Sequence, residues 1–202
     1  MINQKYVYHS SKVRGLKVLE PRPSTHKIPW VYATKDIATT AMFLGDNFDF
    51  ICQTGFSKDK PYIWERFKGA FDLGYKNKKG SIYYLKPDSF KENMTSFSSP
   101  EIISEIPVEV EKEVIIDDVQ NFLINLERDG KLKIFMFPNT PEGRSSNKDD
   151  VVERGINWTI DFGENILGQI EEYHPDVLDR VIKGLQEKGY VFETKKWNKY
   201  NK

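Results

Sequence analysis

The residues whose types and spacing could do chemistry lie near the start of the chain. His9 is followed by two small hydroxyl residues, Ser10 and Ser11, and Tyr32 is followed by Ala33. An imidazole at a strand end can bond a ribose hydroxyl, and the hydroxyls beside it can bond an amide. An aromatic face can hold a flat cationic ring by cation–π attraction of about 0.5–2 kcal/mol. We therefore interpret His9 and Tyr32 as a pair able to hold a nucleotide.

The overall composition restricts where such a site could obtain its charge. The chain has 202 residues, with 30 Lys and Arg against 30 Asp and Glu, so its formal net charge is zero. A neutral chain gives no electrostatic argument for nucleic acid, a membrane surface or a strongly acidic partner. Any site for an anion must therefore be built locally.

Cysteine and histidine usage argues against several classes of site. A single cysteine, Cys52, excludes an internal disulfide and a thiolate metal cage, and we expect it to be a buried or incidental thiol in a reducing compartment. The histidines at positions 9, 26 and 174 lack the spacing of metal ligands, so we expect no metal. The chain also has no P-loop and no Gly-x-Gly-x-x-Gly turn.

Without an apolar run long enough to cross a membrane, and without a signal segment, we expect a cytoplasmic protein with no membrane partner.

Alternation of apolar and polar residues between turn signals predicts a β-rich first half. In the first strand His9 shares a face with Val7, so a buried Val7 would direct His9 toward the core as well. The predicted strands cover residues 6–9, 16–19, 30–33, 62–67, 70–73, 81–85, 101–104 and 108–116.

Helical spacing dominates the second half. One early helix is expected at residues 35–44, capped by Thr34. After residue 118 the apolar period changes to that of an amphipathic helix. The later elements are predicted as a strand at 132–137, a loop at 138–147, and helices at 166–173 and 176–188. We therefore predict an α+β protein with a β-rich domain over residues 1–118 and a mainly helical C-terminal region over residues 119–202 packed on it.

Residues 5–116 carry a family resemblance. The segments around His9 and Tyr32 and the strand led by Glu101 resemble the three motifs of diphtheria-toxin-like and poly(ADP-ribose)-polymerase-like ADP-ribosyltransferases. That family places a His, a Tyr and a Glu on three core strands. The resemblance implies an ADP-ribosyltransferase-like split β core with flanking helices. It also implies that NAD is bound as a substrate.

The resemblance assigns a role to each motif. Glu101 would be the catalytic residue, because cleavage of the glycosidic bond of NAD passes through an oxocarbenium-like state that a carboxylate stabilises. Tyr32 would stack on the nicotinamide, and His9 would position a ribose hydroxyl. Smaller residues would complete the NAD site, namely Ser10, Ser11 and Ala33. ADP-ribose would pass to an unknown acceptor, protein or nucleic acid, or to water in an NAD glycohydrolase.

Three alternatives remain open from the sequence. Glu105 could replace Glu101 as the acid. Ser10 stands where the family carries glycine, and its Cβ could crowd the ligand, which favours a non-catalytic nucleotide-binding or protein-interaction module. An RNA 2′-phosphotransferase on the same fold would need a cluster of basic residues that the sequence does not show.

Overall fold

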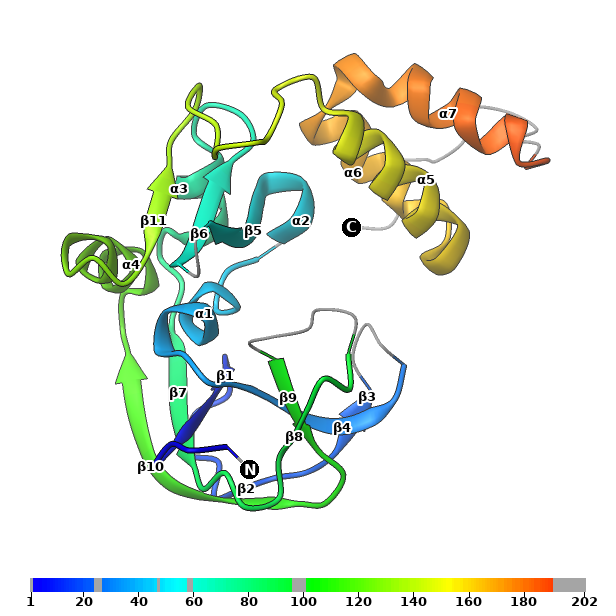
Figure 1. Cartoon of the computed structure of the whole chain (residues 1–202). Coiled ribbons are helices and arrows are strands. Elements are labelled where there is room, and N and C mark those ends of the chain that lie inside the picture. Colours follow the sequence, from blue (N-terminus) through cyan, green and yellow to red (C-terminus); the bar gives the residue numbers. More distant parts are fainter. Residues whose placement is uncertain (1, 24–26, 47, 58–59, 96–100, 191–202) are drawn as a thin grey trace.

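The computed structural model describes residues 2–23, 27–46, 48–57, 60–95 and 101–190. In these residues the chain forms a large sheet, a three-stranded sheet, and helices that lie between and beside them (Figure 1). Strand pairing is antiparallel except between two strands of the smaller sheet. The prediction of an α+β protein with a helical C-terminal region is therefore confirmed.

The large sheet contains most of the strands that the sequence predicts. Its strands are β1 (Val7–Ser11), β2 (Val18–Leu19), β3 (Arg22–Pro23), β4 (Pro29–Thr34), β7 (Gly80–Leu85), β8 (Lys91–Glu92), β9 (Glu101–Ser104) and β10 (Val108–Ile116). Their order is β2-β10-β7-β1-β4-β9-β8, and β3 pairs with β4. The three strands that carry His9, Tyr32 and Glu101 are thus consecutive neighbours in one sheet.

A short helix, α1 (Ile37–Met42), packs between the two sheets. The smaller sheet has the order β11-β6-β5 and consists of β5 (Cys52–Ser57), β6 (Lys60–Glu65) and β11 (Lys133–Phe135). The adjoining helices are α2 (Phe48–Ile51), α3 (Ala70–Tyr75) and α4 (Val119–Arg128). Residues from α1, α3, α4 and both sheets share one apolar cluster, which includes the buried thiol of Cys52. Burial of that thiol is confirmed, and burial raises its pKa.

The opposite face of the large sheet carries a second apolar cluster. Val7, Ala33 and Tyr83 belong to it and are almost completely buried. Leu16, from the segment after β1, packs against the same cluster. Because side chains alternate along a strand, β1 and β4 contribute alternate residues to the two sides of the sheet.

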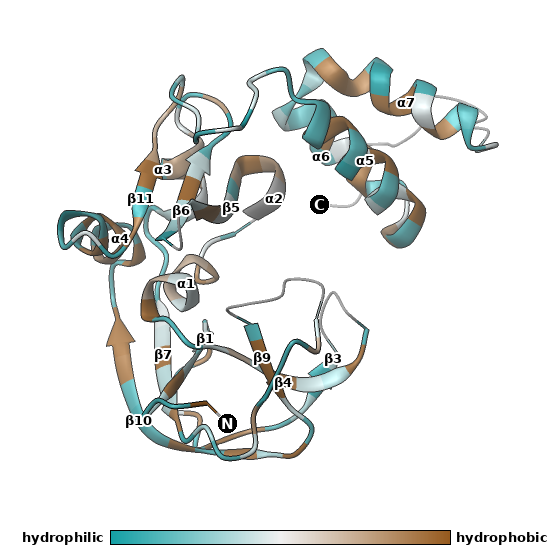
Figure 2. Cartoon of the chain, viewed as in Figure 1, coloured by the Kyte–Doolittle hydropathy of each residue, from teal (hydrophilic) through white to brown (hydrophobic). Residues whose placement is uncertain are grey.

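The last helices form a third cluster of their own. They are α5 (Asp149–Phe162), α6 (Asn165–Tyr173), the 3₁₀ turn η1 (Pro175–Val177) and α7 (Leu178–Glu187). Figure 2 shows hydrophobic and hydrophilic residues alternating along α5, α6 and α7, and the apolar residues gather around Phe50 of α2. Buried side chains therefore group α4 and β11 with the sheets, although both follow residue 118, and they group α5, α6 and α7 separately.

Two polar contacts attach these helices to the rest of the molecule. Arg66 is 4% exposed and donates two hydrogen bonds to Asp150, at 2.6 and 2.8 Å, and a third to Gln53. His174 is fully buried, and its Nε2 lies 2.6 Å from the carbonyl oxygen of Phe50. A buried guanidinium needs such partners because an unpaired buried charge is strongly unfavourable.

Several local predictions are wrong. Residues 70–73, predicted as a strand, lie in α3, where the buried carboxylate of Glu65 accepts a hydrogen bond from the backbone N–H of Phe71. Asp36, not Thr34, caps α1 by accepting from the backbone N–H of Thr39. Helices α2 and α5 and strand β5 were not predicted from the sequence.

Burial of His174 predicts a loss of stability in acid. Burial lowers its pKa from 6.5 to about 4, so the native state excludes a proton that the unfolded chain binds between these values. Its contribution is complete above pH 6.5, and about 3 kcal/mol is lost as pH falls to about 4. In urea unfolding, the unfolding free energy should fall more from pH 7 to pH 5 for the wild type than for His174→Gln, which can still donate to Phe50. An equal fall in both proteins would show that His174 is not the source of the acid sensitivity.

Candidate functional site

Strands β1 and β4 are joined by little backbone pairing. The structure gives one aligned pair between them, Tyr8 with Thr34, whereas β1 pairs with β7 along its whole length. On its other edge β4 pairs with β9 from Val31 to Thr34. A side chain of β1 contacts the backbone of β4 at Tyr32, two residues from this aligned pair.

His9 occupies this position. Its Nδ1 lies 2.7 Å from the carbonyl oxygen of Tyr32. Because a carbonyl can only accept, Nδ1 carries the hydrogen, and in the neutral ring Nε2 carries the lone pair. Burial lowers the pKa of His9, with the Tyr32 carbonyl acting in the opposite direction. At neutral pH the ring is therefore uncharged and can accept a hydrogen bond from a hydroxyl through Nε2.

Tyr32 keeps an accessible ring. The side chain is half-buried and belongs to neither apolar cluster of the large sheet. Its hydroxyl donates to the carbonyl oxygen of Ile28 at 2.9 Å, and its ring lies 6.1 Å from that of Trp30. These contacts orient the ring without sealing it in the core.

Glu101 is the first residue of β9 and pairs with Thr34. Its side chain is half-buried. Glu105 lies beyond the other end of the strand, where it is exposed and forms an ion pair with Lys91. Four residues of extended chain separate the two acids by about 13 Å. The register thus favours Glu101 over Glu105 as the acid nearer to His9.

The small residues of the predicted site, Ser10, Ser11 and Ala33, differ in burial and in hydrogen bonding. Ser10 is half-buried and pairs with Ile82 on β7. Ser11 accepts a hydrogen bond from the backbone N–H of Val13 at 3.1 Å. The methyl group of Ala33 lies in the second apolar cluster, so Ala33 could meet a ligand only through its backbone.

The register brings some of the predicted residues together and separates others. Tyr8, Thr34 and Glu101 are aligned across β1, β4 and β9, so their side chains leave the sheet on one face. Tyr32, two positions from Thr34, shares that face and is a diagonal neighbour of Glu101 at about 7–8 Å. His9 leaves on the opposite face and reaches the Tyr32 carbonyl through Nδ1.

Two residues on the His9 face were not predicted. Tyr83 on β7 pairs with His9 on one side and with Glu113 on β10 on the other. The rings of His9 and Tyr83 lie 6.4 Å apart. Both strands were predicted from alternation, but their register was not, and without it nothing links positions 9, 83 and 113.

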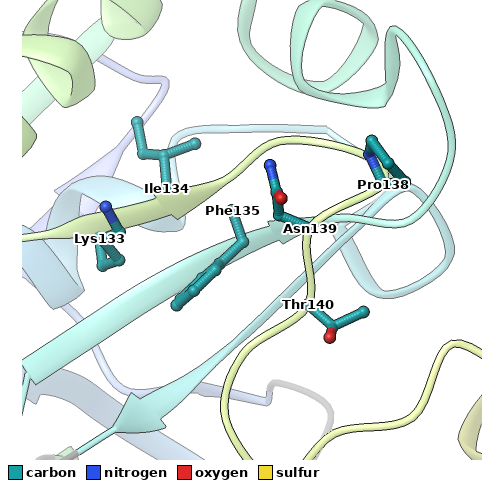
Figure 3. Close-up of a pocket in the computed structure, with 6 residues that line it drawn as sticks. All are labelled: Lys133, Ile134, Phe135, Pro138, Asn139 and Thr140. Carbon is teal, nitrogen blue, oxygen red and sulfur yellow. The ribbon is translucent and has the colours of Figure 1, made fainter.

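A cavity of about 570 Å³ lies elsewhere in the molecule, beside β11. Figure 3 shows Lys133, Ile134 and Phe135 of the strand facing it together with the chain from Pro138 to Thr140. None of the predicted site residues lines this cavity. The predicted nucleotide site therefore depends on strand register and not on this cavity.

The described residues also bear on metal binding and on membrane crossing. No group of three or more His, Cys, Asp or Glu residues there could hold a metal ion. No helix there is both long enough and apolar enough to cross a membrane.

Comparison with known proteins gives no family for the chain. No family model, no curated protein and no solved structure matches it. The ADP-ribosyltransferase resemblance therefore stays a prediction drawn from three motifs. The order and register of β1, β4 and β9 describe where those motifs lie.

The buried hydroxyl of Thr34 leads to a prediction about stability. Thr34 is 6% exposed and donates to the carbonyl oxygen of Asp36 at 2.7 Å, and its hydroxyl also contacts that of Thr40. Thr34→Val keeps the shape but removes the buried hydrogen bonds of the Thr34 hydroxyl, while Asp36 and Thr40 keep other partners, so it should lower the unfolding free energy by about 0.5–1.5 kcal/mol. Thr34→Ser, which keeps the hydroxyl, is the matched control in urea unfolding. A valine variant as stable as the wild type would show that the hydroxyl is dispensable.

Proposed function

We propose that the protein binds NAD and breaks the bond between nicotinamide and ribose, as an ADP-ribosyltransferase or NAD glycohydrolase. The observation that carries the proposal is the consecutive order of β1, β4 and β9, with the His9 ring bonded to the Tyr32 carbonyl and Glu101 a diagonal neighbour of Tyr32. Three motifs that are 23 and 69 positions apart in the sequence meet on neighbouring strands.

The proposed chemistry uses each of the three residues differently. The bond between ribose C1′ and the nicotinamide nitrogen breaks, and the electron pair leaves with nicotinamide. The half-buried carboxylate of Glu101 stabilises the positive charge that develops on the ribose. An acceptor oxygen or nitrogen then bonds to C1′ and loses its proton. Protein, nucleic acid and water are all candidate acceptors.

The binding residues would hold the dinucleotide in place. The accessible ring of Tyr32 offers a face for the cationic nicotinamide. The Nε2 of His9, which carries a lone pair at neutral pH, would accept a hydrogen bond from a ribose hydroxyl. His9 therefore positions the ligand and transfers no proton. The single reduced thiol, Cys52, suits a cytoplasmic protein.

The catalytic assignment predicts a separation of binding from turnover. Glu101→Gln keeps the size of the side chain but removes its charge, so nicotinamide release should fall by at least about 100-fold, as for other lost transition-state contacts. NAD binding should stay nearly unchanged. Glu105→Gln is the matched control, because it makes the same change on the same segment at an exposed position. Full activity of Glu101→Gln would exclude Glu101 as the catalytic residue.

A non-catalytic nucleotide-binding or interaction module is the alternative, and a thermal titration distinguishes it. NAD at 100 times its dissociation constant should stabilise the wild type by about 2.7 kcal/mol. Stabilisation without nicotinamide release would indicate a nucleotide-binding module. An unchanged melting temperature at millimolar NAD would exclude a dinucleotide site altogether.

A further inference from the structure

Glu113 is an acid on the same face of the large sheet as His9. His9, Tyr83 and Glu113 form one aligned row across β1, β7 and β10. Directly opposite residues in antiparallel strands point the same way and lie close enough to interact. Glu113 is half-buried, whereas Glu109 and Glu111 on the same strand are exposed or bonded elsewhere.

The carboxylate of Glu113 gathers several donors at one oxygen. Its Oε1 accepts from the hydroxyl of Ser81 at 2.6 Å and from the backbone N–H of Gly15 at 3.0 Å. The hydroxyl of Tyr83 lies 3.2 Å from the same oxygen and donates to the carbonyl oxygen of Val13 at 2.8 Å. These hydrogen bonds, led by that from Ser81, lower the pKa of Glu113, so it is charged at neutral pH.

The contacts hold the segment of residues 12–16, which we call the β1 loop. Its residues 12–15 are exposed, and Val13 is 58% exposed, so apolar burial does little to fix this part of the loop. Polar contacts fix it instead, at Val13 and Gly15, and at Leu16, whose backbone N–H lies 3.4 Å from the Tyr83 hydroxyl. Gly15 has a φ of 75°, a backbone conformation that favours glycine.

The β1 loop directly continues the strand that carries His9, Ser10 and Ser11. The first residue after the strand is tied back to it, since the backbone N–H of Val13 donates to the Ser11 hydroxyl. Ser11 also lies close to β7, where a Cβ on Gly80 would stand 2.8 Å from the Ser11 carbonyl oxygen. The end of β1 is thus fixed on one side by β7 and on the other by the loop that Glu113 holds.

We propose that Glu113 is a positioning residue for the ligand site. By holding the β1 loop against Tyr83, it fixes the end of β1, so that His9 and the two serines meet the ligand in one arrangement. The inference rests on the proposed function and adds to it a residue that does not touch the reacting atoms.

The test compares Glu113→Ala with Glu113→Gln, which keeps an acceptor oxygen, and with Glu109→Ala as the matched control on β10. In Glu113→Ala, amide hydrogen exchange at residues 13–16 should rise about tenfold, the effect of losing roughly one net hydrogen bond. The KM for NAD in nicotinamide release should rise by about the same factor, with kcat within about twofold. Glu113→Gln should recover most of both changes, and Glu109→Ala should match the wild type.

Other results would overturn the inference. Unchanged exchange at residues 13–16 would show that Glu113 does not hold the loop. Faster exchange with an unchanged KM would show that Glu113 has a purely structural role. A fall in kcat that parallels a fall in the fraction of folded protein would show the same. Failure of the proposed function is distinguishable, because it appears in the wild type as absent NAD binding and turnover. The positioning role would then fall with it, whatever the exchange rates show.

Discussion

A single aligned residue pair, Tyr8 with Thr34, connects the β2-β10-β7-β1 half of the large sheet to the β4-β9-β8 half. The hydroxyl of Thr40 on α1 reaches both sides of this junction, contacting the Thr34 hydroxyl and lying 3.4 Å from the carbonyl oxygen of Tyr8. One helix side chain thus supplements the backbone bonds that the two strands lack. Because the junction is buried, each unsatisfied group there would carry a desolvation penalty of about 1–3 kcal/mol.

The candidate site lies where β1 and β4 meet, and these strands share one aligned residue pair. The imidazole of His9 donates to the Tyr32 carbonyl at 2.7 Å, which selects the tautomer of the ring and leaves Nε2 as an acceptor. The position of His9 beside β4 thus commits its side chain to one hydrogen-bonding state.

The sequence predicted the positions of the strands in this region but not the register in which they pair. Strand-like segments between turn signals located residues 81–85 and 101–104 closely, and alternation located residues 108–116. These local patterns could not give register, so the row from His9 to Glu113 was missed, as was the separation of His9 from Tyr32 onto opposite faces. Helix α5 was missed because its buried line is Val151, Gly155 and Thr159, in which small or polar residues replace the expected apolar stripe. Gly155 is small because α7 packs close, with a Cβ there lying 3.1 Å from Val181.

Two contacts between the C-terminal helices and the rest of the molecule differ in strength. Near α2 and β6, the buried Arg66 is held by Asp150 and Gln53, and removing either charge partner of such a pair typically costs about 3–5 kcal/mol. At the far end of α5, Lys27 lies 5.6 Å from the ring of Phe162, which is 42% exposed, and an exposed cation–π contact contributes about 0.5–1 kcal/mol. Lys27 adjoins Ile28, whose carbonyl holds the Tyr32 hydroxyl. The contact at Arg66 is therefore the stronger of these two attachments, and the contact of Lys27 with Phe162 contributes little to holding the C-terminal helices.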